Sequence, residues 1–458
     1  MVINKTVNDA RASSRTGPEV RRPLRPTEKW FWIADQVSPV TGAARVHLRG
    51  QLPAGLLERA AACLAAEYPL LRVSITSDGR GKNPAFVPSA GPIPIRRVLG
   101  DDREWERQVE ECELSTPLDW RRGPLVRIVD VVLNSPDEAH DLLLVLSHII
   151  ADGITGLSLL RKLVEHADRL SVAGCDDDFV DSRPIVDAPE DLLPARYRGV
   201  RGIARVAVTE VAHRITAAVT RPRRLVPELV VPAPQRKTRM LRRTLTSTQL
   251  DALRQRCRTE GVTVHCALTA AMAMAVGPVA AQKDSGRICV GSPVNIRTDL
   301  EPAVAPDEVG AYVAMWQSIL RFGGDDDLWS IARQVERAAG RRRRFGQHLG
   351  LVYAMRFLVP ASVAKSSRVF EFIDRHGPGN VCVSNMGRYD FPTQIGEWRL
   401  SGAQLAVNIS ISGYFVAIIN TCHDELFCNF FYIDGVVAEQ SAQYLADGCI
   451  QALLGVLD

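Results

Sequence analysis

A short apolar run in the first half of the chain limits the fold more than any other feature. Residues 142–146 read Leu-Leu-Leu-Val-Leu, a run of strand length with no polar residue on either face. Such a run is typical of a strand that is covered on both sides of its sheet. A helical pattern follows at residues 156–170, with Leu157, Leu160 and Leu163 on one side. The sequence therefore predicts an α/β protein in which helices cover the sheet.

The order of the elements divides the chain into two halves. With 458 residues, the chain is too long for one ordinary hydrophobic core. A second series of elements begins where Thr246 and Gln249 form the pattern of a capping box. We expect a flexible arm at residues 1–23, halves of comparable size at 24–195 and 244–458, and a basic crossover helix with a Pro-rich linker at 196–243.

Periodicity and turn residues predict the individual elements. A short helix near the start of the folded part carries Trp30 and Trp32, with Thr27 as its N-cap. The most apolar stretch, residues 266–281, is too short to span a membrane and is interrupted by Gly277-Pro278. Further strands are expected at 45–49, 126–133, 288–294, 309–321, 380–384, 405–412, 414–421 and 426–433, and further helices at 56–68, 249–259, 264–276 and 436–454.

The net charge is concentrated in one segment. The whole chain carries +4, whereas residues 196–243 carry +11, so the remainder carries −7. This distribution argues against a general nucleic-acid-binding protein and for one basic surface that meets an acidic partner. The chain has ten cysteines, none in a CxxC pair, and no apolar core in its first 25 residues. These features predict a cytoplasmic protein with reduced thiols and no transmembrane segment.

The turn after the apolar run contains the residues best suited to catalysis. It reads Ser-His-Ile-Ile-Ala-Asp-Gly at residues 147–153. His148 titrates near neutrality and is the candidate general base, which takes a proton from an attacking hydroxyl or amine. Asp152 is expected to hold the turn through a distant arginine, and Gly153 to supply a strained or left-handed backbone. The alternative is a histidine that is bonded into a turn without a catalytic role.

Neither a nucleophile nor a metal site is predicted near this turn. Ser147 precedes His148 and, by the alternation of a strand, points to the opposite face. This favours direct transfer of a group over a covalent enzyme intermediate. Cys422, His423 and Cys428 lack the regular spacing of a zinc site, so we expect no metal there.

The motif His148-x-x-x-Asp152-Gly153 after an apolar strand resembles the signature of the condensation-domain and CoA-dependent acyltransferase superfamily. The resemblance is strongest to the free-standing polyketide-associated acyltransferases, because Val-Ser-Asn-Met-Gly at 383–387 is similar to their Ser-Asn-x-Gly element. Ser147 stands where the family commonly has a first histidine. The Asp-Phe-Gly-Trp-Gly element of plant-type members is absent, as are adenylation, carrier and thioesterase segments. Other segments resemble family motifs in the expected order at 24–32, 67–72, 291–297 and 309–313.

The resemblance implies two chloramphenicol-acetyltransferase-like halves that form a V-shaped pseudo-dimer around a central cleft or tunnel. There, His148 would deprotonate a hydroxyl of a polyketide, glycolipid or other secondary metabolite. The acyl group would come from a CoA or carrier-protein thioester, and no further cofactor is implied. Ser384 and Asn385 are expected to line the oxyanion site, and Arg297 to form a buried ion pair with Asp152.

Two alternatives stay open. A free-standing enzyme of the peptide-synthetase condensation type would form an amide with the same base. A degenerate condensation-like domain would only bind a carrier protein, although the intact His148 and Asp152-Gly153 argue against this.

Two basic segments are candidates for contact with the donor. Arg341, Arg342, Arg343 and Arg344 either meet phosphates of CoA or a carrier protein, or form a solvated helix face. The breadth of the basic segment 196–243 favours a carrier protein over free CoA. Its first part predicts a helix that packs on the protein rather than on an anionic membrane. That helix has apolar residues at Val200, Ile203, Ala207, Val211, Ile215 and Ala218, and basic residues at Arg198, Arg201 and Arg205.

Overall fold

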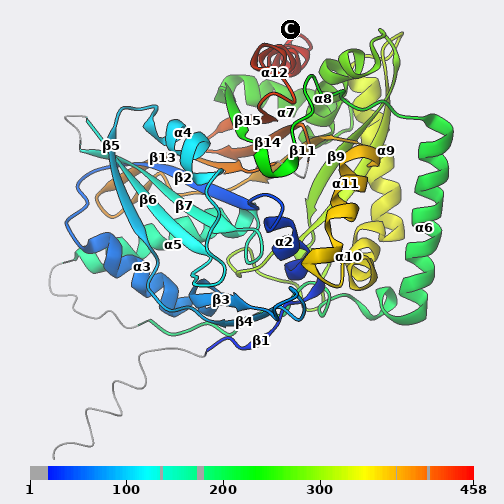
Figure 1. Ribbon diagram of the computed structural model, residues 1–458. Helices are drawn as coiled ribbons and strands as arrows, with labels where there is room; N and C mark the ends of the chain where they lie inside the picture. Colours follow the sequence, from blue (N-terminus) through cyan, green and yellow to red (C-terminus); the bar gives the residue numbers. More distant parts are fainter. Residues whose placement is uncertain (1–18, 135–137, 173–179, 378, 410–412, 458) are drawn as a thin grey trace, which may run out of the picture.

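The computed structural model describes residues 19–134, 138–172, 180–377, 379–409 and 413–457 (Figure 1). Within these residues the strands form two six-stranded sheets and one three-stranded sheet. Most of the expected arm at 1–23 lies outside the described residues. Its last two residues form β1 (Arg22–Pro23), which pairs with β4 (Ala85–Pro88), and β4 pairs with β3 (Val73–Thr76).

The first large sheet contains the predicted doubly covered strand near its centre. This strand, β7 (Ala139–Ser147), is buried at every position, which confirms the prediction from its apolar run. Helices α3 (Leu56–Glu67) and α5 (Gly153–Ser171) pack together on one face, and α4 (Glu104–Arg107) lies on the other (Figure 1). The strand order is β12 (Gln394–Ile395), β13 (Trp398–Val407), β2 (Thr41–Arg49), β7, β6 (Val126–Leu133) and β5 (Ile95–Gly100).

The second large sheet is formed by the C-terminal part of the chain. Three helices cover one of its faces, namely α7 (Ser247–Thr259), α8 (Val264–Ala281) and α12 (Glu439–Leu454) (Figure 1). The capping box predicted at Thr246 and Gln249 is present at the start of α7. The strand order is β10 (Val313–Phe322), β9 (Gly286–Asn295), β11 (Val381–Arg388), β14 (Phe415–Cys422), β15 (Glu425–Ile433) and β8 (Thr238–Leu245).

One strand joins the two halves. β13 comes late in the chain, yet it pairs antiparallel with β2 of the first sheet, with Leu400 opposite Leu48. The next strand, β14, lies in the second sheet. Among the described strands, the chain therefore passes between the two large sheets three times, from β7 to β8, from β11 to β12 and from β13 to β14. One hydrophobic core contains residues of both sheets. The architecture is the expected pair of α/β halves, while the residue bounds that we assigned to them stay a prediction.

Three local expectations are wrong. Arg25 rather than Thr27 is the N-cap of α2 (Pro26–Asp35), because Pro26 occupies the first helical position and Glu28 accepts a hydrogen bond from the Arg25 backbone N–H at 2.7 Å. The strand expected at 309–321 begins at residue 313. Helices α10 (Gln347–Leu358) and α11 (Ser367–His376) have no counterpart among the predicted elements.

The most apolar helix, α8, is also longer than expected. It runs unbroken through Gly277-Pro278 to Ala281. Gly277 is needed there because an added Cβ would lie 2.6 Å from the Phe322 ring. Among the described residues, α8 alone has the length and hydropathy of a membrane span, but 61% of it is buried inside the protein, as in a core helix.

The helix of the basic segment forms as predicted, but its orientation is not the one expected. This helix, α6 (Gly199–Thr220), was expected to pack its apolar residues on the protein. Instead, Val200, Val211 and Ile215 are exposed by 82, 55 and 58%. The helix meets the protein through its opposite side, where Gly202 is buried.

Candidate active site

His148 lies at the point where β7 leaves the first sheet. Its backbone N–H donates to the Val40 carbonyl at 2.8 Å, which fixes the turn against the end of β2. Its ring is half-buried and stacks on Phe31 of α2, with ring centroids 4.9 Å apart and an interplanar angle of 10°. The Nδ1 atom is buried and has no hydrogen-bond partner among the described residues. The imidazole is therefore positioned mainly by its stacking on Phe31 and by its own backbone, with a contribution from the Ala151 backbone.

Burial disfavours the charged form of this imidazole. Removal from water lowers the pKa of His148 from its ordinary value, and the negative charge of Asp152 and the Ala151 backbone offset only part of this effect. A neutral ring at neutral pH can accept a proton. The shift therefore favours the neutral form of His148.

Asp152 caps the helix that follows the turn. Its Oδ1 accepts from the Thr155 N–H at 3.0 Å, which makes it the N-cap of α5. Arg297 donates to both carboxylate oxygens, at 2.6 and 3.1 Å, and the Tyr312 N–H donates to Oδ2 at 2.9 Å. The structure therefore contains the buried ion pair that was expected between Asp152 and Arg297.

The ion pair fixes the charge of the carboxylate as well as its position. Burial raises the pKa of Asp152, but the charge and hydrogen bonds of Arg297 outweigh it, so the pKa lies below its ordinary value. Asp152 and Arg297 are only 9 and 1% exposed. Both carboxylate oxygens are engaged by these partners, and within the described residues neither is bonded to His148.

Gly153 was expected to supply a strained or left-handed backbone, but the structure gives a different reason for a glycine at this position. It is the first residue of α5, and its backbone is not left-handed. Its lack of a side chain matters because an added Cβ would lie 2.9 Å from Leu405 Cδ1 and 2.9 Å from Met386 Sδ. Gly153 thus allows β13 and the end of β11 to approach the turn closely.

The start of α5 is also where the two halves of the molecule meet. The Thr155 hydroxyl donates to the Gly310 carbonyl at 3.0 Å, and the Ser158 hydroxyl donates to the Pro306 carbonyl at 3.2 Å. Tyr389 directly follows β11, and its hydroxyl donates to Ser158 Oγ at 3.1 Å. His148 therefore sits on the N-terminal half, directly beside the contact with the C-terminal half.

The candidate oxyanion residues lie on β11. Ser384 is 5% exposed and Asn385 is half-buried. The Asn385 side chain accepts from the Gly387 N–H at 2.9 Å, which shapes the end of the strand. Met386 of the same strand lies beside Gly153. The structure thus brings this strand end to the active-site turn, while the role of Ser384 and Asn385 stays a prediction.

The four-arginine run does not form one surface. It ends α9 (Leu328–Phe345), where Arg342 turns inward and donates to the Gln317 carbonyl and, at 3.4 Å, to Ser318 Oγ. Arg343 pairs with Glu336 at 3.0 Å. Arg341 and Arg344 are exposed, and neither has an ion pair among the described residues. Only these two are free to meet a phosphate.

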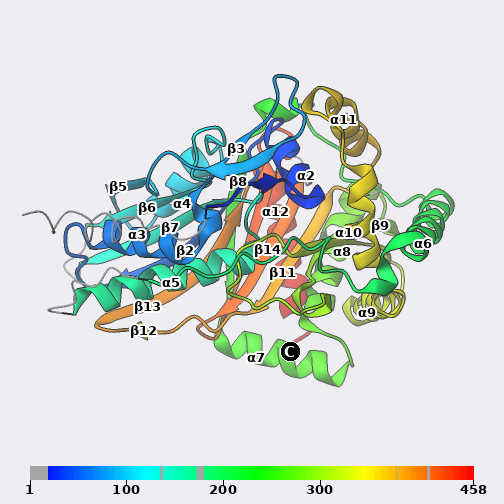
Figure 2. The same ribbon diagram turned by 90° about the horizontal axis from the view of Figure 1, so that it is seen from below.

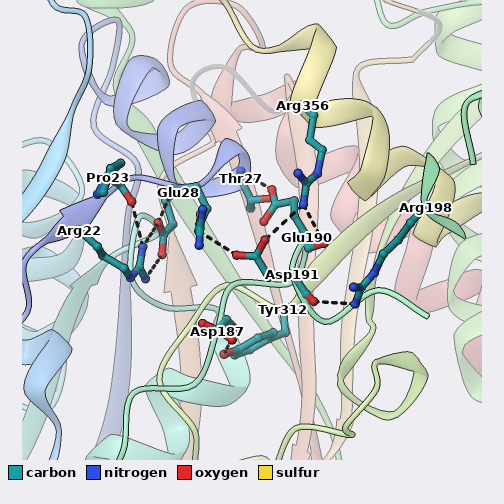
Figure 3. A network of polar contacts seen from close by, with 11 residues as sticks. Arg22, Pro23, Thr27, Glu28, Asp187, Glu190, Asp191, Arg198, Tyr312 and Arg356 are labelled. Carbon is teal, nitrogen blue, oxygen red and sulfur yellow. Dashed lines mark hydrogen bonds and ion pairs between the residues drawn. The ribbon is translucent and has the colours of Figure 1, made fainter. Parts of the chain in front are cut away.

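A polar network fixes the helix that carries Phe31 (Figure 3). The Thr27 N–H and hydroxyl both donate to Glu190 Oε1, at 2.6 and 2.5 Å. The neighbouring residue Asp191 accepts from Arg356 of α10 at 3.2 Å. These contacts join α2 to a distant segment and to the C-terminal half, and so position Phe31 beside His148.

The same network reaches the active-site carboxylate. Tyr312 donates its N–H to Asp152 and its hydroxyl to the Asp187 carbonyl at 3.1 Å (Figure 3). Sequence reasoning did not identify Phe31 or Glu190. Thr27 and Glu190 are 163 positions apart, so no local pattern connects them. The resemblance of residues 24–32 to an opening motif was the one available signal.

The fold is similar to that of known condensation domains and acyltransferases, which is the fold that the resemblance predicted. The trichothecene 15-O-acetyltransferase of Fusarium sporotrichioides is similar with a TM-score of 0.73 at 15% identity, over 96% of this chain and 97% of that one. The first condensation domain of the calcium-dependent antibiotic synthetase has a TM-score of 0.70 at 17% identity, over 96% of both chains.

Relatives of the polyketide-associated type are found by structure and by sequence. Polyketide synthase associated protein 5 from Mycobacterium tuberculosis has a TM-score of 0.63 at 17% identity, over 96% of this chain and 100% of that one. The family described as phthiocerol/phthiodiolone dimycocerosyl transferase C-terminus matches residues 234–395.

One curated protein is similar in sequence to part of this chain. It is a linear gramicidin synthase protein of Brevibacillus parabrevis, which is 29% identical over 157 residues, or 32% of this chain. The chain spans about 2% of the length of that protein. Together, the structural matches show the fold that condensation domains and acyltransferases share.

Proposed function

We propose that the protein transfers an acyl group from a thioester to a hydroxyl, with His148 as general base. The observation that carries this proposal is the environment of His148. Its ring is stacked on Phe31, its pKa is lowered by burial, and it lies on a turn that the buried Asp152–Arg297 pair fixes. A general base must be neutral and held in place at working pH, and these properties support both requirements.

The proposed reaction needs no covalent enzyme intermediate. The imidazole takes the hydroxyl proton as the oxygen attacks the thioester carbonyl carbon, which forms a C–O bond and a tetrahedral oxyanion. When this intermediate collapses, the C–S bond breaks and the imidazolium returns its proton to the thiolate. The products are an ester and a free thiol. Ser147 Oγ accepts from the Ile149 N–H at 3.3 Å and is buried, which supports a structural rather than a nucleophilic role.

The oxyanion requires donors that are in place before the reaction. Ser384 and Asn385 are our candidates because β11 ends beside Gly153. We expect Ser384→Ala to lower turnover by roughly tenfold or more, while substrate affinity changes less. The measurement is kcat and KM with one acyl donor and one acceptor. Loss of affinity with unchanged kcat would remove Ser384 from this role.

The acyl donor in this proposal carries a phosphopantetheine arm, as CoA or on a carrier protein. Arg341 and Arg344 are the exposed arginines of the run that could meet its phosphates. A broad patch for a carrier protein is less well supported than the sequence suggested, because Arg236, Arg242 and Arg243 pair with Asp374, Glu106 and Asp447.

Donor and acceptor can be tested together. Acyl-CoA and the acylated carrier protein are each offered with alcohol and amine acceptors, and thiol release and product mass are measured. We expect ester products. If the rate with the acylated carrier protein falls between low salt and ~0.5 M salt, while the rate with acyl-CoA does not, the carrier protein is the partner. Thioester consumption that needs no His148, or no transfer with any pair, would contradict the proposal.

Amide formation is the second candidate. It is favoured by the sequence match to a gramicidin synthase protein and by the likeness to condensation domains. The same base serves an amine, so the site geometry does not separate the two products. Preferential transfer to amine acceptors in the same assay would establish this alternative. A protein that binds a carrier protein but transfers nothing would be a non-catalytic module.

A further inference from the structure

Helix α6 presents an apolar face to solvent. The exposed fractions of its described large side chains run from 46% for Ile203 to 82% for Val200. On the opposite side, Gly202 is buried, and an added Cβ would lie 3.3 Å from the ring of Tyr353 on α10. Figures 1 and 2 both show α6 at the outer edge of the molecule, with no other element beyond it.

The exposed residues form a continuous stripe. Positions that recur every three or four residues lie on the same side of a helix. The 22 residues of α6 give a length of about 33 Å at ~1.5 Å per residue. An exposed apolar surface of this extent marks an interaction site. The stripe consists of Val200, Ala204, Ala207, Val208, Val211, Ile215, Ala218 and Val219.

Unpaired positive charge lies at both ends of this stripe. Arg201 is exposed in the first turn, and Arg221 and Arg223 are exposed just beyond the last. In the part of the chain that the structure describes, none of the three has an ion pair. Further along the basic segment the arginines are neutralised within the protein, in the pairs Arg236–Asp374, Arg239–Asp434, Arg242–Glu106 and Arg243–Asp447. Arg201, Arg221 and Arg223 therefore leave free positive charge at both ends of α6.

We propose that α6 is a membrane-docking helix that lies on an anionic lipid surface. Its aliphatic face would enter the acyl boundary, while the arginines at its ends contact lipid phosphates. A second copy of the chain is a poorer partner, because it would bring like charges together. A protein partner is also less well supported, since the stripe lacks the aromatic anchors that dominate such interfaces. This inference is independent of the reaction proposed above.

Vesicle co-sedimentation of the full chain tests the proposal. One set of vesicles is pure phosphatidylcholine, and the other contains equal parts of phosphatidylcholine and phosphatidylglycerol. We expect binding to the anionic vesicles, weakened at ~0.5 M salt. Val211→Glu with Ile215→Glu should reduce that binding at least about tenfold, because two charges enter the apolar face. Arg221→Gln with Arg223→Gln should weaken it and reduce its salt dependence.

The matched control is Leu99→Glu. Leu99 is 73% exposed on β5, at the opposite edge of the molecule (Figure 1). This variant should bind anionic vesicles like the parent, and all variants should melt like the parent because every altered position is exposed. Absence of binding to anionic vesicles, or equal binding by the Val211→Glu, Ile215→Glu variant, would overturn the proposal. So would a dimer in light scattering that only this variant dissociates, since α6 would then be an interface between copies.

Discussion

At the scale of single residues, the active-site turn depends on charge balance and on close packing. Asp152 receives four hydrogen bonds, two of them from Arg297. Because a buried charge that loses its partner is strongly unfavourable, Asp152→Ala should cost ~3–5 kcal/mol of stability. Chemical denaturation measures this loss. Replacement of both partners, Asp152→Leu with Arg297→Met, should restore part of it, and equal losses in both variants would contradict the ion-pair account.

Packing around Gly153 gives a second prediction at this scale. Gly153→Ala places a Cβ 2.9 Å from two side chains, so we expect a loss of ~1–3 kcal/mol and lower turnover. Gly340→Ala on α9 is the matched control, since nothing lies within 4 Å of its added Cβ. An alanine at this exposed helical position should stabilise by ~0.5–1 kcal/mol. If both variants raised the melting temperature, or both lowered it, by similar amounts, helix propensity rather than packing would decide the outcome at Gly153.

At the scale of elements, α2 supports the ring of His148, the proposed general base. Phe31 covers one face of the His148 ring and helps to exclude water. We expect Phe31→Leu to raise the pKa of His148 toward ~6.5, so the acid limb of the rate profile moves to higher pH. Phe372→Leu is the control, because Phe372 also stacks on a histidine, His376, at 5.1 Å. A profile that shifts equally in both variants, or in neither, would contradict this role of Phe31.

The anchor of α2 predicts a pH-dependent stability. Burial raises the pKa of Glu190, although the hydrogen bonds from Thr27 offset part of this effect. The folded state therefore favours the neutral acid, and this contribution to stability is lost as pH rises through the raised pKa. Glu190→Gln stays neutral at every pH. The melting temperature of the variant relative to the parent should thus increase between pH 5 and pH 8, and a constant difference would contradict the raised pKa.

At the scale of the whole molecule, the sequence predicts what local patterns determine. The all-apolar run identified β7, the helical spacing identified α3, α5 and α6, and the His148 motif located the turn between β7 and α5. Pairing across the chain was beyond such patterns. The strand expected at 405–412 overlaps only the last three residues of β13, and nothing local shows that β13 joins the first sheet.

Orientation was likewise not determined by local pattern. Helical spacing shows which residues of α6 share a side. Only the packing of Gly202 against α10 shows that the opposite, apolar side faces solvent. The contact of Thr27 with Glu190 depends on the same tertiary arrangement. The candidate site was therefore predicted at His148, Asp152 and Arg297, whereas its supports, Phe31 and Glu190, became visible only in the structure.

The most direct test of the account is the single-turnover rate of acyl transfer by His148→Ala. If His148 is the general base, the rate should fall ~10²–10⁴-fold from that of the parent. The melting temperature should change little, because the buried Nδ1 atom has no hydrogen-bond partner among the described residues that the fold would lose. An unchanged single-turnover rate in the folded variant would contradict the mechanism.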